Sequence, residues 1–144
     1  MAVDAFIGFG FRRLFNALAG TVTSTGASGY DRESRYYYMP LALDARLDLH
    51  NSWLINPVLE YDLLLRGQQI SYLSDVGLRD VTNNQNSGYG LRISMRIVKS
   101  TKYLNLFVEP FMRYWHIGQS SINGGGFEPE NNTREIGSKL GIEF

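Results

Sequence analysis

The sequence contains no cysteine and carries no net charge. Lys plus Arg and Asp plus Glu both number 14, which gives a formal net charge of zero. The absence of cysteine excludes disulfide scaffolds, thiolate metal sites and cysteine nucleophiles. A neutral chain with no basic run argues against a nucleic-acid-binding surface, so we expect no nucleic-acid partner.

Long apolar runs are missing as well. No stretch reaches the 18 or more apolar residues expected of a transmembrane helix. Residues 1–10 have neither the basic start nor the cleavage motif of a signal peptide. If the protein is exported, we therefore expect this chain to be a mature form or a fragment. Its 144 residues support one domain, residues 1–144, with a sizeable core.

What the sequence does contain is a repeated alternation of apolar and polar residues. Between residues 36 and 49, Leu41, Leu43 and Leu47 alternate with Asp44 and Arg46. A helix would scatter these charges around its circumference, whereas a strand gathers them on one face. The same pattern predicts six strands in simple up-and-down order, at residues 3–14, 36–49, 53–66, 88–98, 103–117 and 133–144.

The predicted connections alternate between long and short. Polar segments at residues 17–35, 67–87 and 118–132 are predicted loops, of which the segment at 67–87 begins as a possible extension of the preceding strand. Short turns join the strands at residues 50–52 and 99–101. All long loops should therefore emerge at one end of an antiparallel sheet and both short turns at the other.

Alternation gives each strand an apolar and a charged face without saying which one meets water. A soluble barrel such as a lipocalin would turn the apolar face inward around an apolar ligand. A transmembrane β-barrel would turn it to lipid and enclose the charges. The long unbroken apolar faces and the loop asymmetry favour the transmembrane barrel. The soluble, lipocalin-like barrel is the alternative.

The transmembrane hypothesis divides the strand residues into two sets. The predicted lipid-facing residues are Leu41, Leu43, Leu47, Leu59, Leu63, Leu91, Ile93, Met95, Leu104, Leu106, Val108, Met112, Leu140, Ile142 and Phe144. The predicted internal charge network comprises Asp44, Arg46, Asp48, Glu60, Asp62, Arg92, Arg96, Glu109, Arg113, Glu135, Lys139 and Glu143. Such a network is favourable only when nearly every member is paired.

Aromatic residues gather near both ends of the predicted strands. Amphipathic rings concentrate at the two interfaces of a membrane, so two girdles are predicted. One comprises Tyr36, Tyr37, Tyr38, Tyr89, Tyr114 and Trp115 near the long loops, and the other Trp53, Tyr103 and Phe144 near the short turns.

The last predicted strand carries the most specific pattern. Ile136, Leu140, Ile142 and the terminal Phe144 share one face. This strand resembles the closing strand of Gram-negative outer-membrane β-barrel proteins, and the whole pattern is similar in architecture to the small OmpA-like and opacity-type barrels. The resemblance implies location in the outer membrane, contact with membrane lipid and lipopolysaccharide, and recognition of the last strand by the barrel assembly machinery. It also implies a structural, surface-recognition or minor porin-like role, in which the long loops meet an unknown extracellular ligand.

Closed bacterial barrels usually have at least eight strands, two more than the pattern predicts. Either further strands precede Met1, which we favour, or a loop hides a hairpin. Because proline cannot donate a ladder hydrogen bond, we also expect a bulge or a solvent-facing gap at Pro57 and at Pro110.

No catalytic, cofactor or metal site is predicted. His50 lies in a short turn, and His116 near Ser120 and Ser121 lacks an acidic partner on its own face, as a nucleophile–base pair would need. A lipid-modifying outer-membrane enzyme is the only enzymatic alternative. Carboxylates such as Asp44 and Asp62 could gather a hard cation, but we expect the neighbouring arginines to neutralise them.

Overall fold

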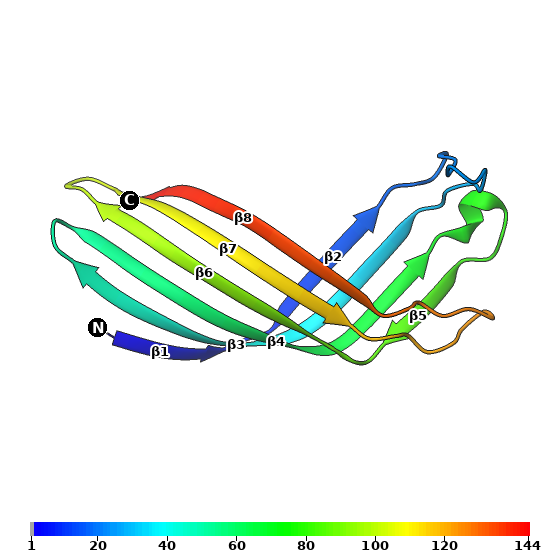
Figure 1. Ribbon diagram of the computed structural model, residues 1–144, viewed down its shortest axis with the longest axis horizontal. Helices are drawn as coiled ribbons and strands as arrows, with labels where there is room; N and C mark the ends of the chain where they lie inside the picture. Colours follow the sequence, from blue (N-terminus) through cyan, green and yellow to red (C-terminus); the bar gives the residue numbers. More distant parts are fainter. Residues whose placement is uncertain (1) are drawn as a thin grey trace.

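Long antiparallel strands dominate the computed structural model, which describes residues 2–144 (Figure 1). One eight-stranded up-and-down sheet contains them all, which confirms the predicted all-β fold class. The strands are β1 (Ala2–Ile7), β2 (Gly10–Asn16), β3 (Arg32–Leu49), β4 (Trp53–Ser71), β5 (Val81–Gln85), β6 (Gly88–Ser100), β7 (Asn105–Ile117) and β8 (Asn131–Glu143), and a short 3-10 helix, η1 (Leu73–Val76), follows β4.

The eight strands occupy only six positions across the sheet. β1 and β2 pair with β3 one after the other, so the predicted strand at residues 3–14 is interrupted. β5 and β6 do the same with β4, and β5 lies within the predicted loop at residues 67–87. The predicted loops at 17–35 and 67–87 are too long. Residues 32–35 belong to β3, β4 continues to Ser71, and the polar β5 pairs with that extension of β4.

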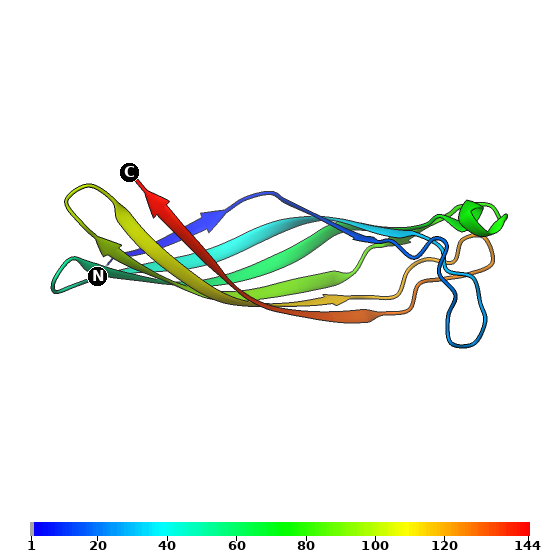
Figure 2. The same cartoon turned by 90° about the horizontal axis from the view of Figure 1, so that it is seen from above.

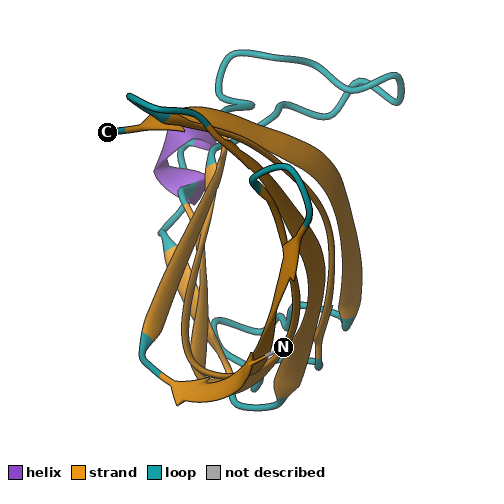
Figure 3. Ribbon diagram, turned by 90° about the vertical axis from the view of Figure 1, so that its left-hand side faces the viewer, coloured by secondary structure: helices purple, strands orange, loops and turns teal. Residues whose placement is uncertain are grey.

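The sheet curls strongly about its long axis but does not close into a barrel (Figures 2 and 3). Within residues 2–144, no ladder joins β8 to β1 or β2. Side chains nevertheless reach across the open side, because Arg12 on β2 forms an ion pair with Glu135 on β8. The two edge strands are thus linked by side chains rather than by backbone hydrogen bonds.

One irregularity in the ladder changes which side chains of β4 point inward. Tyr37 pairs with Arg66 but Tyr38 pairs with Leu64, so Leu65 is an extra residue in β4. Before this bulge the buried residues of β4 have even numbers, and after it they have odd numbers. The two prolines produce no such shift. The pairing is interrupted between β3 and β4 beside Pro57, and between β6 and β7 beside Pro110, while the register continues unchanged.

The concave face holds the small apolar core of the protein. Tyr36, Leu64, Trp115 and Ile117 are buried there and Tyr38 packs against them, near the long-loop end. Tyr36, Tyr38 and Trp115 therefore do not belong to an outer aromatic girdle. The prediction grouped them by position along the strand, whereas strand parity puts them on the same face as Asp44 and Arg113.

Candidate functional site

The convex face of the sheet is apolar over most of its length. Most of the predicted lipid-facing residues are exposed there, with Leu43 and Ile93 each 53% exposed and Leu140 79% exposed. Leu47, Leu104 and Val108 are half-buried, and Leu104 lies just before β7. The side chains that would form the core of a soluble sandwich or ligand-binding barrel thus point away from the interior of the curl.

Aromatic residues limit this apolar band along an inclined line. Leu43, Leu59, Ile93 and Met112 pair with one another across β3, β4, β6 and β7 and so form one row. Toward the long loops, Tyr37 is six residues from this row, Tyr89 four and Tyr114 two. With about 3.3 Å per residue and about 4.8 Å between strands, the tyrosine line is inclined to the row by about 40°.

A second boundary lies near the short turns and runs almost parallel to the first. Trp53 is six residues from Leu59, and Tyr103 is nine residues from Met112. Along β7 the apolar band extends from Tyr114 to Tyr103, which is about 36 Å of strand and about 27 Å perpendicular to the inclined tyrosine line.

The concave face brings the predicted charge network together. At its centre, Arg92 donates to Glu109 at 2.7 Å and lies 3.8 Å from Glu60. Arg113 donates to the same Glu60 at 3.3 Å, and Lys139 lies 3.5 Å from Glu109. Four strands thus contribute alternating charges to one continuous chain of ion pairs.

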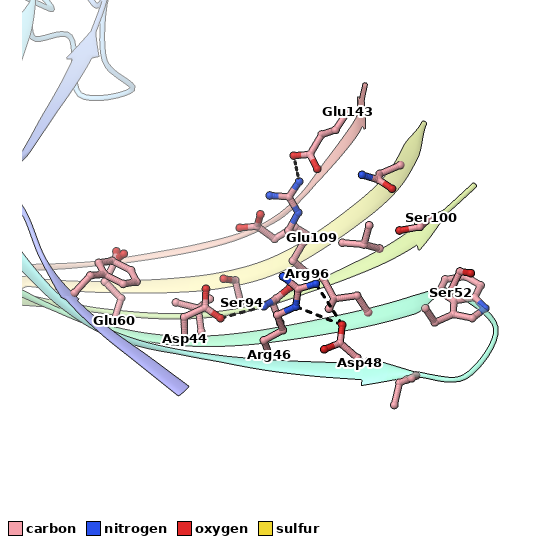
Figure 4. A pocket seen from close by; sticks show the side chains of 18 of the residues that line it. Asp44, Arg46, Asp48, Ser52, Glu60, Ser94, Arg96, Ser100, Glu109 and Glu143 are labelled. Atoms are coloured by element: carbon pink, nitrogen blue, oxygen red, sulfur yellow. Dashed lines mark hydrogen bonds and ion pairs between the residues drawn. The ribbon is translucent and has the colours of Figure 1, made fainter. Parts of the chain in front are cut away.

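Nearer the short turns, the same face forms an open trough with a volume of about 550 Å³ (Figure 4). Arg46 lies 3.3 Å from Asp48, Asn56 donates to Asp44 at 3.2 Å, and Arg96 pairs with Glu143. The charged residues that line the trough are the carboxylates Asp44, Asp48, Glu60, Glu109 and Glu143 and the arginines Arg46, Arg92 and Arg96, so acidic groups are in excess.

Asp62 is the member of the network that stands apart. Its side chain is fully buried beside Trp115, and neither carboxyl oxygen has a hydrogen-bond partner within residues 2–144. Glu135 finds its partner in Arg12, a residue that the sequence-based prediction omitted. Parity could have identified Arg12, since it shares the polar face of the first predicted strand.

Glycines on the concave face leave room for aromatic rings from the neighbouring strand. A Cβ atom at Gly137 would lie 2.8 Å from the Phe111 ring, and one at Gly141 would lie 2.4 Å from the Phe107 ring. A Cβ atom at Gly10 would likewise lie 2.2 Å from the Tyr38 ring. Together with the arginine side chains over Phe107 and Phe111, these rings fill space between the ion pairs.

A separate ionic cluster lies on the convex face beyond the tyrosine line. Glu33 is almost fully buried, and its Oε1 accepts hydrogen bonds of 2.6 Å from Nε of both Arg13 and Arg35. Its Oε2 accepts a 2.9 Å hydrogen bond from the Tyr72 hydroxyl. The hydrogen bonds from Arg35 and Arg13 hold the pKa of Glu33 well below its usual range, and the same bonds raise the pKa of both arginines.

The long loops are joined to one another rather than separate. Asn83 of β5 donates to the carbonyls of Ser121 and Gly126, and Asn123 donates to the carbonyl of Thr82. Asp75 of η1 accepts a 2.9 Å hydrogen bond from the backbone N–H of Asp31. The segments around residues 17–31, 72–80 and 118–130 therefore form a connected rim at one end of the sheet.

Polar and aromatic side chains surround His116. His116 lies on the convex face, where Nδ1 contacts the Asn132 side chain at 2.9 Å and the ring packs against Tyr89. Residues 2–144 include no group of three or more His, Cys, Asp or Glu side chains that could hold a metal ion.

No helix within the described residues has the length and hydropathy needed to cross a membrane. No protein-family model matches the chain, and no curated protein matches it either.

Proposed function

We propose that this chain is part of a transmembrane β-barrel of the bacterial outer membrane, with a structural or surface-recognition role rather than a catalytic one. The observation that carries the proposal is the apolar convex band between two inclined aromatic boundaries. Its height of about 27 Å is close to the roughly 25 Å apolar band of known transmembrane barrels, and the inclination of about 40° falls within their range of strand tilt.

The distribution of charge supports the same proposal. In a ligand-binding soluble barrel, apolar side chains surround the ligand. Here the concave face carries Arg92, Glu60 and Glu109 in mutual contact, and large apolar side chains such as Leu43 and Ile93 point outward. An apolar ligand would displace ion pairs from that face, at a high desolvation cost.

The open sheet has a direct consequence under this proposal. Unpaired backbone groups in hydrocarbon cost several kcal/mol each, so the edges at β1 and β8 require additional strands in the membrane. We propose that a further strand pair, from the same gene product or another copy, completes the barrel. The last strand, ending in Phe144, would be recognised by the barrel assembly machinery, as in the proteins that this strand resembles.

The interior suggests little conductance. Ion pairs, Phe107, Phe111 and Trp115 fill much of the concave face, so any pore should be narrow. The connected rim of long loops is the part that would meet an extracellular ligand, since rigid scaffolds place recognition on loops.

Folding from urea, with and without lipid, tests the proposal. The chain is diluted into didecanoyl-phosphatidylcholine vesicles or into buffer, followed by circular dichroism and protease digestion. We expect β-structure and protection of the strands only with vesicles. A soluble, folded, protease-resistant monomer in buffer alone would refute the membrane assignment.

A further inference from the structure

Three arginines lie close together on the convex face, between the tyrosine line and the long loops. Arg13 on β2 pairs directly with Arg35 on β3. Arg66 on β4 pairs with Tyr37, two residues from Arg35, and is therefore its diagonal neighbour. Because the bulge at Leu65 changes the parity of β4, Arg66 is exposed on this face instead of turning inward.

The cluster contains more positive than negative charge. Glu33 is the carboxylate that binds Arg13 and Arg35, and Arg66 has no hydrogen bond or ion pair to any of residues 2–144. Like charges directly opposite each other destabilise a sheet pair, and one shared carboxylate balances only part of the repulsion among three guanidinium groups. The arrangement therefore favours a second anion from outside the chain.

The geometry leaves suitable donors for that anion. Glu33 uses only the Nε–H of Arg13 and of Arg35. The terminal Nη groups of both arginines make no hydrogen bond within the described part of the chain. Glu33 holds both arginine side chains through their Nε–H groups and is itself held by the Tyr72 hydroxyl. Planar guanidinium groups held in this way match the oxygen geometry of a phosphate.

The position of the cluster indicates where the anion comes from. Phe11 and Tyr37 pack together at 5.0 Å between ring centroids, next to the arginines on the side of the apolar band. Arg35 is two residues beyond Tyr37, which puts it about 5 Å outside the tyrosine boundary. A lipid phosphate occupies this level, just outside the hydrocarbon.

We propose that Arg13, Arg35 and Arg66 form a binding site for the phosphate of an anionic lipid headgroup. The proposal rests on the membrane location proposed above and adds a specific lipid contact to it. The phosphate would accept hydrogen bonds from the free Nη groups, while Glu33 keeps two of the arginines in place.

Native mass spectrometry of the chain folded in dodecyl maltoside micelles tests this site. Phosphatidic acid, which has a phosphate monoester headgroup, is titrated against phosphatidylcholine with identical acyl chains. We expect phosphatidic acid to bind at least about tenfold more tightly. Each arginine near an anionic lipid contributes enough for roughly a fivefold change in affinity, so Arg66→Gln should weaken phosphatidic acid binding about fivefold.

Two further variants distinguish a specific phosphate-binding site from a general effect of surface charge on lipid binding. The triple variant Arg13→Gln, Glu33→Gln, Arg35→Gln removes the pair of arginines without leaving Glu33 buried and uncompensated, and should weaken binding at least about fivefold. Arg134→Gln is the matched control, because Arg134 is also exposed and lies on the same face of β8. Its phosphatidic acid affinity should equal that of the unchanged chain.

The outcomes distinguish the two proposals. Equal losses for Arg66→Gln and Arg134→Gln, or no loss for either, would overturn the headgroup site while leaving the membrane assignment intact. Displacement of phosphatidic acid by an equal concentration of inorganic phosphate would indicate a site for free phosphate and would also overturn it. Failure of the unchanged chain to form β-structure in micelles and vesicles alike would refute the membrane assignment itself.

Discussion

Replacing Leu43 and Ile93 together by arginine provides the sharpest test of which environment the convex face meets. Leu43 lies midway between Tyr37 and Leu49, which pairs with Trp53, and is about 15 Å from either boundary of the apolar band once strand tilt is included. On β6, Ile93 is four residues from Tyr89 and six from Lys99, which pairs with Trp53, so it lies about 10 Å from one boundary and about 15 Å from the other. Both side chains are therefore close to the middle of the proposed hydrocarbon layer.

The expected magnitudes differ strongly between water and lipid. An arginine at the bilayer midplane of a barrel costs about 2–4 kcal/mol, so the double variant should lose about 4–8 kcal/mol or fail to insert. In water, two side chains that are already 53% exposed would change stability by only about 0.5 kcal/mol each when replaced by arginine.

Urea titration of the protein folded in phosphatidylcholine vesicles measures this difference. Leu78→Arg and Ile122→Arg are the controls, because both residues are exposed and lie in the long loops, outside the band. These controls should insert and unfold like the unchanged chain. If the double variant also retains its stability in vesicles, the convex face does not meet hydrocarbon and the reasoning from the aromatic boundaries is refuted.

Three further changes test the packing and charge of the described sheet. Gly90→Ala should destabilise the fold by about 1–3 kcal/mol in urea titration, because the new Cβ would lie 2.7 Å from Oδ2 of Asp62 and 2.9 Å from Trp115. Gly8→Ala is the control and should be neutral, because the nearest atom to its new Cβ would be 3.5 Å away. Equal effects of the two changes would contradict the packing argument. Arg92→Met should lower the free energy of unfolding by about 3–5 kcal/mol, because it leaves Glu60 and Glu109 short of a partner. Adding Glu109→Gln should recover part of this loss. A double variant no more stable than Arg92→Met would argue against the ion-pair chain. Glu33 has a folded pKa below its ordinary value of 4.5, so its stabilising contribution is present above about pH 4.5 and is lost as the pH falls below it. The stability difference between the unchanged chain and Glu33→Gln should therefore be constant from about pH 6 to 8 and shrink from about pH 5 to 3, and a difference that stays constant throughout would refute this role of Glu33.

Strand parity predicted the two faces of the sheet well because each face has one dominant chemistry. Where the chemistry is mixed, proximity along the chain misled the prediction. Tyr36 and Tyr38 were assigned to an outer girdle with Tyr37, although successive residues of a strand point to opposite faces. Their parity matched that of Asp44, and the structure puts both rings in the core with Trp115.

Other features had no signal in the sequence. β5 is a polar strand, Val-Thr-Asn-Asn-Gln, that forms because the extended β4 offers it a partner. The extra residue Leu65 is unremarkable in composition, but it reverses the faces of β4 and so exposes Arg66. Both features depend on pairing between strands, which a period of two within one strand does not specify.

The ion pair between Arg12 and Glu135 links the two edges of the sheet by a contact that can form and break reversibly. A backbone ladder between β2 and β8 would have to be broken one hydrogen bond after another, whereas a single pair of side chains can exchange partners in one step. If further strands complete the barrel as proposed, they could enter between the edges by forming ion pairs with these two charges.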